Sequence, residues 1–391
     1  MSQFDTLLIH GTHAFSEEEL SSRAEKYGFS QPLILELFAW DYELAVQLQE
    51  ISDALVLKGG AAVQLHLPPE IQRGSVDLDF ITCLQEKELN QLFSELSRKF
   101  RGFEPFFQFT RYIPRVPKIN LPLSSYDVIL PSVFQENCRI KIDILTSDIS
   151  LPTVKMRDVE TFAIRVSRVK TISPGALIGD KLLTLARKTV GIESEEAYPK
   201  QIYDIEMLAF KSGKLTQRDM EHAAKAIKKI VSEEARFRDI ETSPTEVLED
   251  VRNTMEHYSQ VDLSIGSSST KRSINNFQQF YVNKAERSTR LYEWSSRALR
   301  IRFLATLMQS YLSERINANQ VLRSIQKSQE ISSRIKETNR RNVLKLRKEL
   351  LAYAENLIPR FKELKGKPLE RVLWQVLTPG NMESVAELSK R

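Results

Sequence analysis

The stretch LVLKGGAAVQLHLPPEIQRGSVDLDF, residues 55–80, decides the expected fold. An apolar run enters a Lys-Gly-Gly turn, a short amphipathic segment and a proline-containing loop follow, and an Arg-Gly-Ser turn opens a second strand. Residues i and i+2 of a strand face the same side, so Asp77 and Asp79 point together while Leu78 and Phe80 point to the other face. Two adjacent carboxylates repel each other and resist burial, so a cation or water must lie against them.

A later strand, RIKIDIL at residues 139–145, repeats this arrangement. Its isoleucines line one face, while Arg139, Lys141 and Asp143 line the other. If the two strands are neighbours, three carboxylates meet on one patch, which suits Mg²⁺ because this hard cation prefers oxygen ligands. Two such ions can hold the attacking and leaving oxygens of a nucleotidyl transfer. The alternative for Asp143 is charge pairing with its basic neighbours.

The turns add candidate phosphate contacts. Gly59 and Gly60 follow a strand and precede a short helix, where backbone N–H groups can approach a phosphate. Ser75 lies two residues before the first aspartate and can donate to a triphosphate oxygen. Arg73 either binds phosphate or fixes its loop, and Lys58 either touches the substrate or ends its strand in solvent or an ion pair.

The rest of the chain predicts an α+β protein. Helical spacing covers residues 16–52 and 85–100, and several short strands occur between residues 55 and 169. Beyond Pro174 the pattern is helical throughout, so a mixed sheet with flanking helices precedes an all-helical C-terminal region. We expect long helices over 274–312 and 319–364, and a serine-rich linker at 259–273. The expected domains are 1–210, a helical connector over 211–265, and a basic helical domain over 266–391.

Composition narrows the class of protein. The 391 residues are 41% hydrophobic and 27% charged, as in an ordinary globular protein, and no apolar stretch is long enough to cross a membrane. Two isolated cysteines and the lack of a secretory signal predict a cytoplasmic protein without a zinc site. A G-x-S-x-G elbow is missing, and Lys58 precedes its glycines, so serine-hydrolase and P-loop chemistry are excluded.

Charge is distributed unevenly along the chain. Residues 1–270 hold 31 basic and 40 acidic residues, whereas residues 271–391 hold 25 and 11, which gives net charges of −9 and +14. Lysines and arginines neutralise phosphates, and aromatic rings stack on unpaired bases. The sequence therefore predicts RNA binding by the basic region, with Arg290, Arg297 and Arg300 as candidate contacts. The alternative is a solvated helical bundle without a specific partner.

The order of these motifs resembles the nucleotidyltransferase superfamily and, within it, the AbiEii/AbiGii-type toxins of type IV toxin–antitoxin systems. That family shows a Lys-Gly-Gly turn followed by Arg-x-Ser-x-Asp-x-Asp, and this chain supplies Lys58-Gly59-Gly60 and Arg73-Gly74-Ser75-Val76-Asp77-Leu78-Asp79. The resemblance covers about residues 30–210. A Thr or Ser often follows the two glycines in the family, whereas this chain has Ala61, so a hydroxyl contact from that position is missing.

The resemblance implies a reaction and its residues. A Mg²⁺-dependent enzyme would transfer NMP from an NTP to an RNA acceptor, most simply the tRNA 3′ end, and release pyrophosphate. The implied metal ligands are Asp77, Asp79 and Asp143, with Asp143 also helping to deprotonate the acceptor. A helical Lys181 would stabilise phosphate charge and Asp204 would orient that lysine or the base, so both join the catalytic set. The implied NTP-binding residues are Lys58, Gly59, Gly60, Arg73, Ser75 and Lys181.

Several alternatives remain open at this point. Arg187 or Lys188, two turns after Lys181, could do the work of that lysine. The acceptor could be a protein hydroxyl or a small molecule such as an aminoglycoside instead of RNA. The chain could also be a non-catalytic helical protein that binds RNA or protein. As a toxin it would have a cognate antitoxin as a partner.

Overall fold

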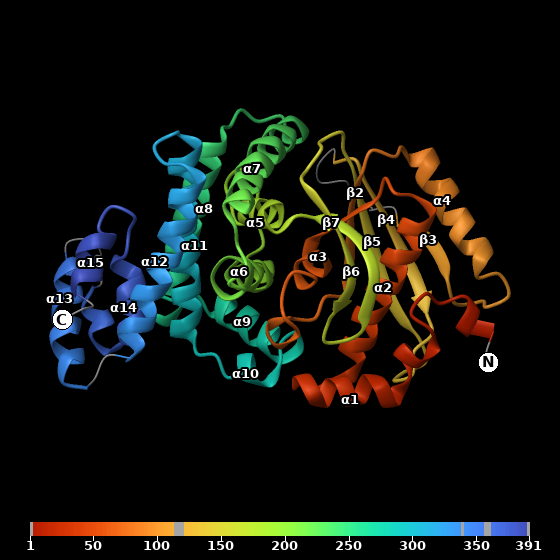
Figure 1. The fold of residues 1–391 in the computed structure, drawn as a ribbon, viewed down its shortest axis with the longest axis horizontal. Helices are drawn as coiled ribbons and strands as arrows, with labels where there is room; N and C mark the ends of the chain where they lie inside the picture. Colours follow the sequence, from red (N-terminus) through yellow and green to blue (C-terminus); the bar gives the residue numbers. More distant parts are fainter. Residues whose placement is uncertain (1–2, 113–120, 338–339, 356–360, 389–391) are drawn as a thin grey trace. The chain divides into compact units, whose positions relative to one another are not determined.

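The computed structural model describes residues 3–112, 121–337, 340–355 and 361–388 of the chain. It contains two compact units (Figure 1). Unit 1 comprises Met1–Leu177, Arg236–Asp239 and Phe277–Ser288, and unit 2 comprises Ile178–Ala235, Ile240–Asn276 and Thr289–Arg391. Each unit is therefore built from segments that are distant in sequence.

Unit 1 contains a mixed seven-stranded sheet in the order β3-β4-β5-β2-β1-β7-β6. The pairs β2–β5 and β1–β7 are parallel, and the other pairs are antiparallel. This sheet confirms the α+β class expected from the sequence. The strands are β1 Val56–Lys58, β2 Asp77–Thr82, β3 Gln108–Tyr112, β4 Leu123–Leu130, β5 Cys138–Thr146, β6 Thr153–Glu160 and β7 Arg165–Ile172.

One face of the sheet is apolar because alternate residues of its strands are hydrophobic. Leu78 of β2 lies opposite Ile142 of β5, which lies opposite Tyr126 of β4, and all three are buried. The Tyr126 ring packs on Phe93 of helix α4 (Glu86–Lys99), with centroids 3.8 Å apart. Helices α2 (Pro32–Ile51) and α4 cover this face, as Figure 1 shows. Residues one position away along each strand therefore point to the opposite, polar face.

The expected helix over 16–52 is divided into α1 (Glu17–Tyr27) and α2. Ser16 caps α1, as the sequence indicates, because its side chain accepts a hydrogen bond from the Glu19 backbone N–H. Gly28 ends α1 in the left-handed region with φ of 75°, and Pro32 starts α2. The remaining short helices of the N-terminal part are η1 Gln3–Thr6, η2 Thr12–Phe15, α3 Gly59–Gln64 and η3 Pro69–Ile71.

A segment from far along the chain completes unit 1. We call residues 277–288 the return segment. It contains the end of α9 (Ser268–Phe280) and all of α10 (Lys284–Arg287). Its backbone accepts a 2.7 Å hydrogen bond from Gly74 N–H at the Tyr281 carbonyl, and the Asn283 side chain donates to the Glu70 carbonyl at 2.6 Å. The return segment thus supports residues 70–75, which we call the Arg73 loop.

Helices make up the described part of unit 2, and α11 packs against α8, η6 and α14. Asn283 starts α10 by accepting from Glu286 N–H, so the expected helix over 274–312 is divided into α9, α10 and α11. The stretch 259–273 contains η6 and the start of α9. The helices that lie wholly or mainly in unit 2 are α5 Pro174–Thr184, η4 Glu195–Ala197, α6 Tyr198–Glu206, the π-helical turn η5 Met207–Lys211, α7 Gln217–Arg238, α8 Pro244–Tyr258, η6 Ser259–Asp262, α11 Leu291–Leu312, α12 Ala318–Glu337, α13 Arg340–Glu355, η7 Phe361–Gly366, α14 Leu369–Val376 and α15 Met382–Leu388. Among the residues described, no helix is both long and apolar enough for a membrane crossing.

Candidate active site

A row of polar side chains crosses five strands on the polar face of the sheet. The register places Lys58 of β1 opposite Asp79 of β2, and Asp79 opposite Asp143 of β5. The row continues through Ser125 of β4 to Tyr112 of the edge strand β3. Paired strands lie about 4.8 Å apart, so the backbones of Asp79 and Asp143 are direct neighbours.

The adjacent row carries the other aspartate of the motif. Asp77 lies opposite Lys141, and Lys141 lies opposite Asp127 of β4. Asp77 is exposed, whereas Asp79 and Asp143 are half-buried. The structure therefore brings the three carboxylates named from the sequence onto two adjacent strands of one sheet face.

Asp143 has two close partners. Ser125 Oγ donates to Asp143 Oδ1 at 2.5 Å, and Lys141 Nζ donates to Asp143 Oδ2 at 2.8 Å. Burial disfavours the ammonium, but the hydrogen bond and charge of Asp143, together with the charges of Asp77 and Asp79, raise the pKa of Lys141. The charge pairing that the sequence left as an alternative for Asp143 is thus present.

The donor set fits a hard divalent cation in its chemistry, since Asp77, Asp79 and Asp143 offer only carboxylate oxygens. Within the ranges that the structure describes, no three acidic, histidine or cysteine side chains form a ready metal cluster. Asp143 directs its oxygens to Ser125 and Lys141 in this arrangement.

Gly59 allows Asp79 to lie against the turn after β1. Its φ is 71°, a conformation that other residues rarely adopt, and a Cβ at this position would overlap the Asp79 carboxylate. Gly60 packs on the Arg73 loop, because a Cβ there would lie 2.9 Å from both Arg73 Nη2 and Ser75 Oγ. The two glycines therefore join the Lys-Gly-Gly turn to the Arg-x-Ser-x-Asp-x-Asp motif.

Arg73 is 2% exposed and supports the loop that carries it. Its Nη1 donates to the Gly74 carbonyl at 2.7 Å, and its backbone N–H donates to Gln64 Oε1 at 2.9 Å. Burial and the charge of Asp77 raise the pKa of Tyr281 in the return segment, while Arg73 lowers it. These contacts correspond to the loop-fixing role, one of the two expected for Arg73. The loop is also supported by Gln64, Tyr281 and Asn283, which no pattern in the sequence singled out.

A further carboxyl near the site was also missed. Asp41 of α2 is fully buried, and among the described residues neither of its oxygens has a hydrogen-bond partner. Burial, followed by the charges of Asp77 and Asp79, raises its pKa well above the ordinary value. The signal in the sequence was a lone aspartate within the apolar run LILELFAWDYELAV, residues 33–46.

Lys181 and Asp204 lie in unit 2 and form a buried ion pair. Lys181 Nζ lies 3.1 Å from Asp204 Oδ2 and donates to Gln201 Oε1 at 2.8 Å. Their side chains are 6% and 0% exposed. The two residues considered as alternatives to Lys181 for contacting phosphate are Arg187 and Lys188. Both are exposed, whereas Lys181 is buried.

The expectation that Arg297 and Arg300 contact RNA is wrong. Both are 3% exposed and belong to the interior of unit 2. The Arg297 guanidinium lies 4.9 Å from the Trp294 ring centroid, and Arg300 forms ion pairs with three carboxylates. Those partners are Glu206 at 2.9 Å, Glu293 at 3.0 Å and Glu370 at 3.3 Å. Of the three candidates, Arg290 alone is exposed.

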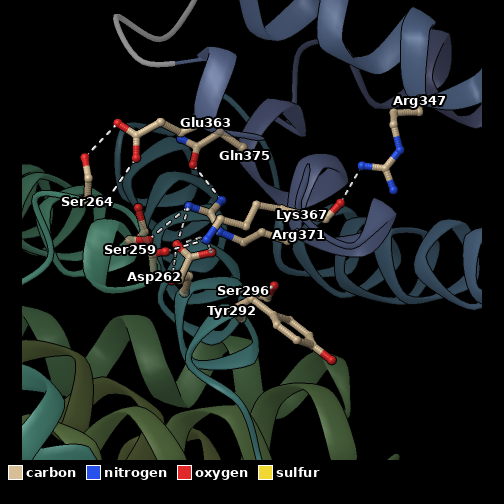
Figure 2. A network of polar contacts seen from close by, with 11 residues as sticks. Ser259, Asp262, Ser264, Tyr292, Ser296, Arg347, Glu363, Lys367, Arg371 and Gln375 are labelled. Carbon is tan, nitrogen blue, oxygen red and sulfur yellow. Dashed lines mark hydrogen bonds and ion pairs between the residues drawn. The ribbon is translucent and has the colours of Figure 1, made fainter. Parts of the chain in front are cut away.

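A second interior network uses more of the basic residues of unit 2 (Figure 2). Arg371 is fully buried and donates to the Ser259 carbonyl at 3.0 Å and to Gln375 Oε1 at 2.7 Å. It also lies 3.4 Å from Asp262, which pairs with Lys367 at 3.4 Å. Arg297, Arg300 and Arg371 therefore stabilise the interior of unit 2 and are not available to a partner.

Comparisons with known proteins identify the family. Residues 44–281 match the model of the nucleotidyl transferase AbiEii toxin family, described as a type IV toxin–antitoxin system. No curated protein matches the chain.

Three similar solved structures are nucleotidyltransferases or resemble them. MenT4, a nucleotidyltransferase toxin from Mycobacterium tuberculosis H37Rv, is 14% identical, with 76% of this chain and 99% of that chain covered and a TM-score of 0.43. A putative nucleotidyltransferase from H. pylori is 16% identical, with 70% and 99% covered and a TM-score of 0.33. An antigenic nucleotidyltransferase-like protein from Paracoccidioides brasiliensis is 14% identical, with 53% and 94% covered and a TM-score of 0.31.

With identities and TM-scores this low, the assignment rests on the family model, which spans more than half of the chain and includes the whole Lys-Gly-Gly to Asp-x-Asp region. The chain belongs to the AbiEii nucleotidyltransferase toxin family.

Proposed function

We propose that this protein transfers NMP from an NTP to the 3′ end of tRNA in a Mg²⁺-dependent reaction. The observation that supports this most strongly is the register of β2 and β5, which puts Asp79 opposite Asp143 with Asp77 one step along the same face. In the Gly59–Gly60 turn, Gly59 lies directly against the Asp79 carboxylate. Asp77 is exposed and the other two carboxylates are half-buried. A set of oxygen donors beside a glycine turn suits a cation and a triphosphate.

In the proposed reaction the carboxylates of Asp77, Asp79 and Asp143 hold Mg²⁺, which neutralises triphosphate charge when bound. Asp143 accepts the proton of the acceptor hydroxyl, and the hydroxyl oxygen forms a bond to the α-phosphorus. The bond between the α-phosphorus and the oxygen bridging to the β-phosphate breaks, and pyrophosphate leaves. Ser75 and the backbone of the glycine turn position the phosphates, while Arg73 keeps their loop in place. Lys58, at the end of β1, remains a candidate NTP contact.

Lys181 is proposed to stabilise phosphate charge, with Asp204 as its positioning residue. The buried ion pair supports this, because the Asp204 carboxylate offsets the cost of burying a charged ammonium that could also face a phosphate. The assignment of both residues otherwise rests on their match to the family pattern.

Two observations support RNA as the acceptor. One is membership of the toxin family, and the other is the positive charge on the surface that remains once the buried arginines are excluded. Exposed basic residues lie at the start of α11 and along α12 and α13. They are Arg290, Arg323, Arg334, Lys336, Lys345 and Lys348. Phosphate contacts of this kind weaken steeply as salt increases. A cognate antitoxin is the partner that the family implies.

A labelling experiment tests the proposal. The protein is incubated with each labelled NTP, Mg²⁺, and either total tRNA, a protein extract or an aminoglycoside. We expect label at the tRNA 3′ end, and its loss in Asp79→Asn, while Asp127→Asn on the neighbouring strand keeps most activity. If label appears only on protein or only on the small molecule, that molecule and not RNA is the acceptor. Label that persists in Asp79→Asn would rule out the carboxylate site.

A further inference from the structure

We propose that Lys141 is the internal counter-ion of the three carboxylates and that its ammonium must leave Asp143 when a divalent cation binds. Lys141 would then be a positioning residue that sets the affinity of the site for metal. This inference rests on the proposed metal-dependent function and concerns the same site.

The geometry places Lys141 among the carboxylates. Its Nζ lies 2.8 Å from Asp143 Oδ2, its backbone pairs with Asp77, and Asp79 pairs with Asp143. Three like charges on adjacent positions of one sheet face repel one another unless a cation lies between them. Lys141 provides such a cation from within the chain, at a position that the proposed metal would share.

The two cations compete because they use the same oxygen. Asp143 Oδ1 accepts from Ser125 and Asp143 Oδ2 accepts from Lys141, so both oxygens are engaged. An ammonium that remained on Oδ2 would face a divalent ion across one carboxylate, and the two positive charges would repel each other. The Lys141 and Asp143 side chains are 39% and 20% exposed, so solvent screens this repulsion only in part.

A second location for the ammonium is already present. The Tyr112 ring is 48% exposed and lies at the end of the row of side chains that contains Asp143. Its centroid is 5.8 Å from Lys141 Nζ. A lysine ammonium is attracted to the face of an aromatic ring, and the four-carbon side chain can rotate without backbone movement. Lys141 can thus exchange Asp143 for Tyr112 while the carboxylate turns to the metal.

The test measures Mn²⁺ binding to the full chain without NTP, by electron paramagnetic resonance or calorimetry. Lys141→Met removes the charge but keeps the length of the side chain, and we expect the Kd for Mn²⁺ to fall by about tenfold. Lys141→Arg keeps the charge, so its Kd for Mn²⁺ should stay close to that of wild type. The matched control is Arg139→Met, because Arg139 is an exposed cation two residues earlier on the same strand and face. Its Kd should change by no more than about twofold.

Thermal unfolding provides an independent readout. Without metal, Lys141→Met should unfold at a lower temperature than wild type, and Mn²⁺ should raise its unfolding temperature by more than it raises that of wild type. Unchanged or weaker Mn²⁺ binding in Lys141→Met, or an equal gain in Arg139→Met, would overturn the role of Lys141. The proposed metal site would still stand after such a result if wild type binds Mn²⁺ and Asp79→Asn does not. If wild type does not bind Mn²⁺ even with NTP present, the proposed function fails as well.

Discussion

At the scale of single residues, Gly59 shows how one missing side chain permits the site. Its positive φ and its contact with Asp79 both require glycine. We expect Gly59→Ala to reduce transferase activity at least about 100-fold, because the new methyl displaces the Asp79 carboxylate from its position in the site. Initial rates of NMP transfer at saturating NTP measure this.

Gly11→Ala is the matched control for the backbone. Gly11 has a φ of 73°, almost the same as Gly59, but a Cβ there meets nothing within 4 Å. Both variants place alanine at a positive φ that L side chains rarely adopt, which should cost about 1 kcal/mol or more in urea unfolding. Equal activity losses in the two variants would show that backbone strain, and not the contact with Asp79, is responsible.

Two carboxyls on α2 should respond to pH in opposite directions. The pKa of Asp41 is raised by burial and by Asp77 and Asp79, so its ionisation destabilises the fold above its unfolded pKa of about 4. Asp41→Asn should therefore gain stability over wild type as pH rises from about 4, and by about 1–3 kcal/mol at neutral pH. Urea unfolding at a series of pH values measures this difference.

Glu43 provides the opposite case two residues along the same helix. Burial opposes its ionisation, but hydrogen bonds from His10, Gln47 and the Ile9 backbone lower its pKa. A lowered pKa contributes stability above the unfolded pKa, and this contribution is lost as pH falls through the folded pKa. Glu43→Gln should therefore be less stable than wild type at neutral pH, and the deficit should shrink in acid. If the stability differences of Asp41→Asn and Glu43→Gln from wild type change with pH in the same direction, the opposite pKa shifts of the two carboxyls would be contradicted.

The sequence predicted part of this site, for reasons that lie in strand geometry. The two-residue period placed Asp77 with Asp79 and Asp143 with Lys141. It left open whether β2 and β5 are neighbours, because parallel pairing depends on contacts more than 60 residues apart. It also could not distinguish the ion pair of Asp143 from a metal ligand, since both place a carboxylate beside positive charge.

At the scale of helices, the burial of α11 means that Arg297 and Arg300 have a structural role and do not contact RNA as the sequence predicted. Arg300 is enclosed by Glu206, Glu293 and Glu370. We expect Arg300→Met to destabilise unit 2 by about 3–5 kcal/mol in urea unfolding, because uncompensated carboxylates stay buried. Arg290→Met, at the exposed start of the same helix, should change stability by no more than about 0.5 kcal/mol. Similar losses in the two variants would argue against the buried network.

This outcome was not accessible from the sequence. Arginines interleaved with Tyr292 and Trp294 occur both in nucleic-acid surfaces and in buried helices with charged partners. The partners that decide between the two are Glu206 and Glu370, which are 94 and 70 residues away from Arg300. Helical periodicity describes one helix at a time, so it predicted the presence of helices better than their burial. The break at Asn283 depended on a cap that the pattern did not single out.

At the scale of the whole molecule, unit 1 depends on its return segment. Asn283 caps α10 through Glu286 N–H and also donates to the Glu70 carbonyl. We expect Asn283→Ala to destabilise unit 1 by about 1–2 kcal/mol, to speed hydrogen exchange in the Arg73 loop, and to raise KM for NTP. Exchange measured by mass spectrometry reports on the loop directly.

Asn317→Ala is the matched control for the cap. Asn317 accepts from Gln320 N–H at the start of α12, in unit 2, and so has the same local role without a contact to the Arg73 loop. It should lose similar stability while loop exchange and KM stay at wild-type values. A loop unaffected by Asn283→Ala would mean that Tyr281 alone supports it.

The return segment also sets an order for synthesis on the ribosome. Arg73 leaves the ribosome about 200 residues before Asn283, which at typical elongation rates corresponds to roughly 10–40 seconds. During that interval a nascent chain has its paired aspartates but lacks the return segment that holds the Arg73 loop. Newly made molecules should therefore complete the proposed nucleotide site only late in translation. Ribosome-bound chains stalled near residue 265 should leave the Arg73 loop open to protease, and chains stalled near residue 330 should protect it.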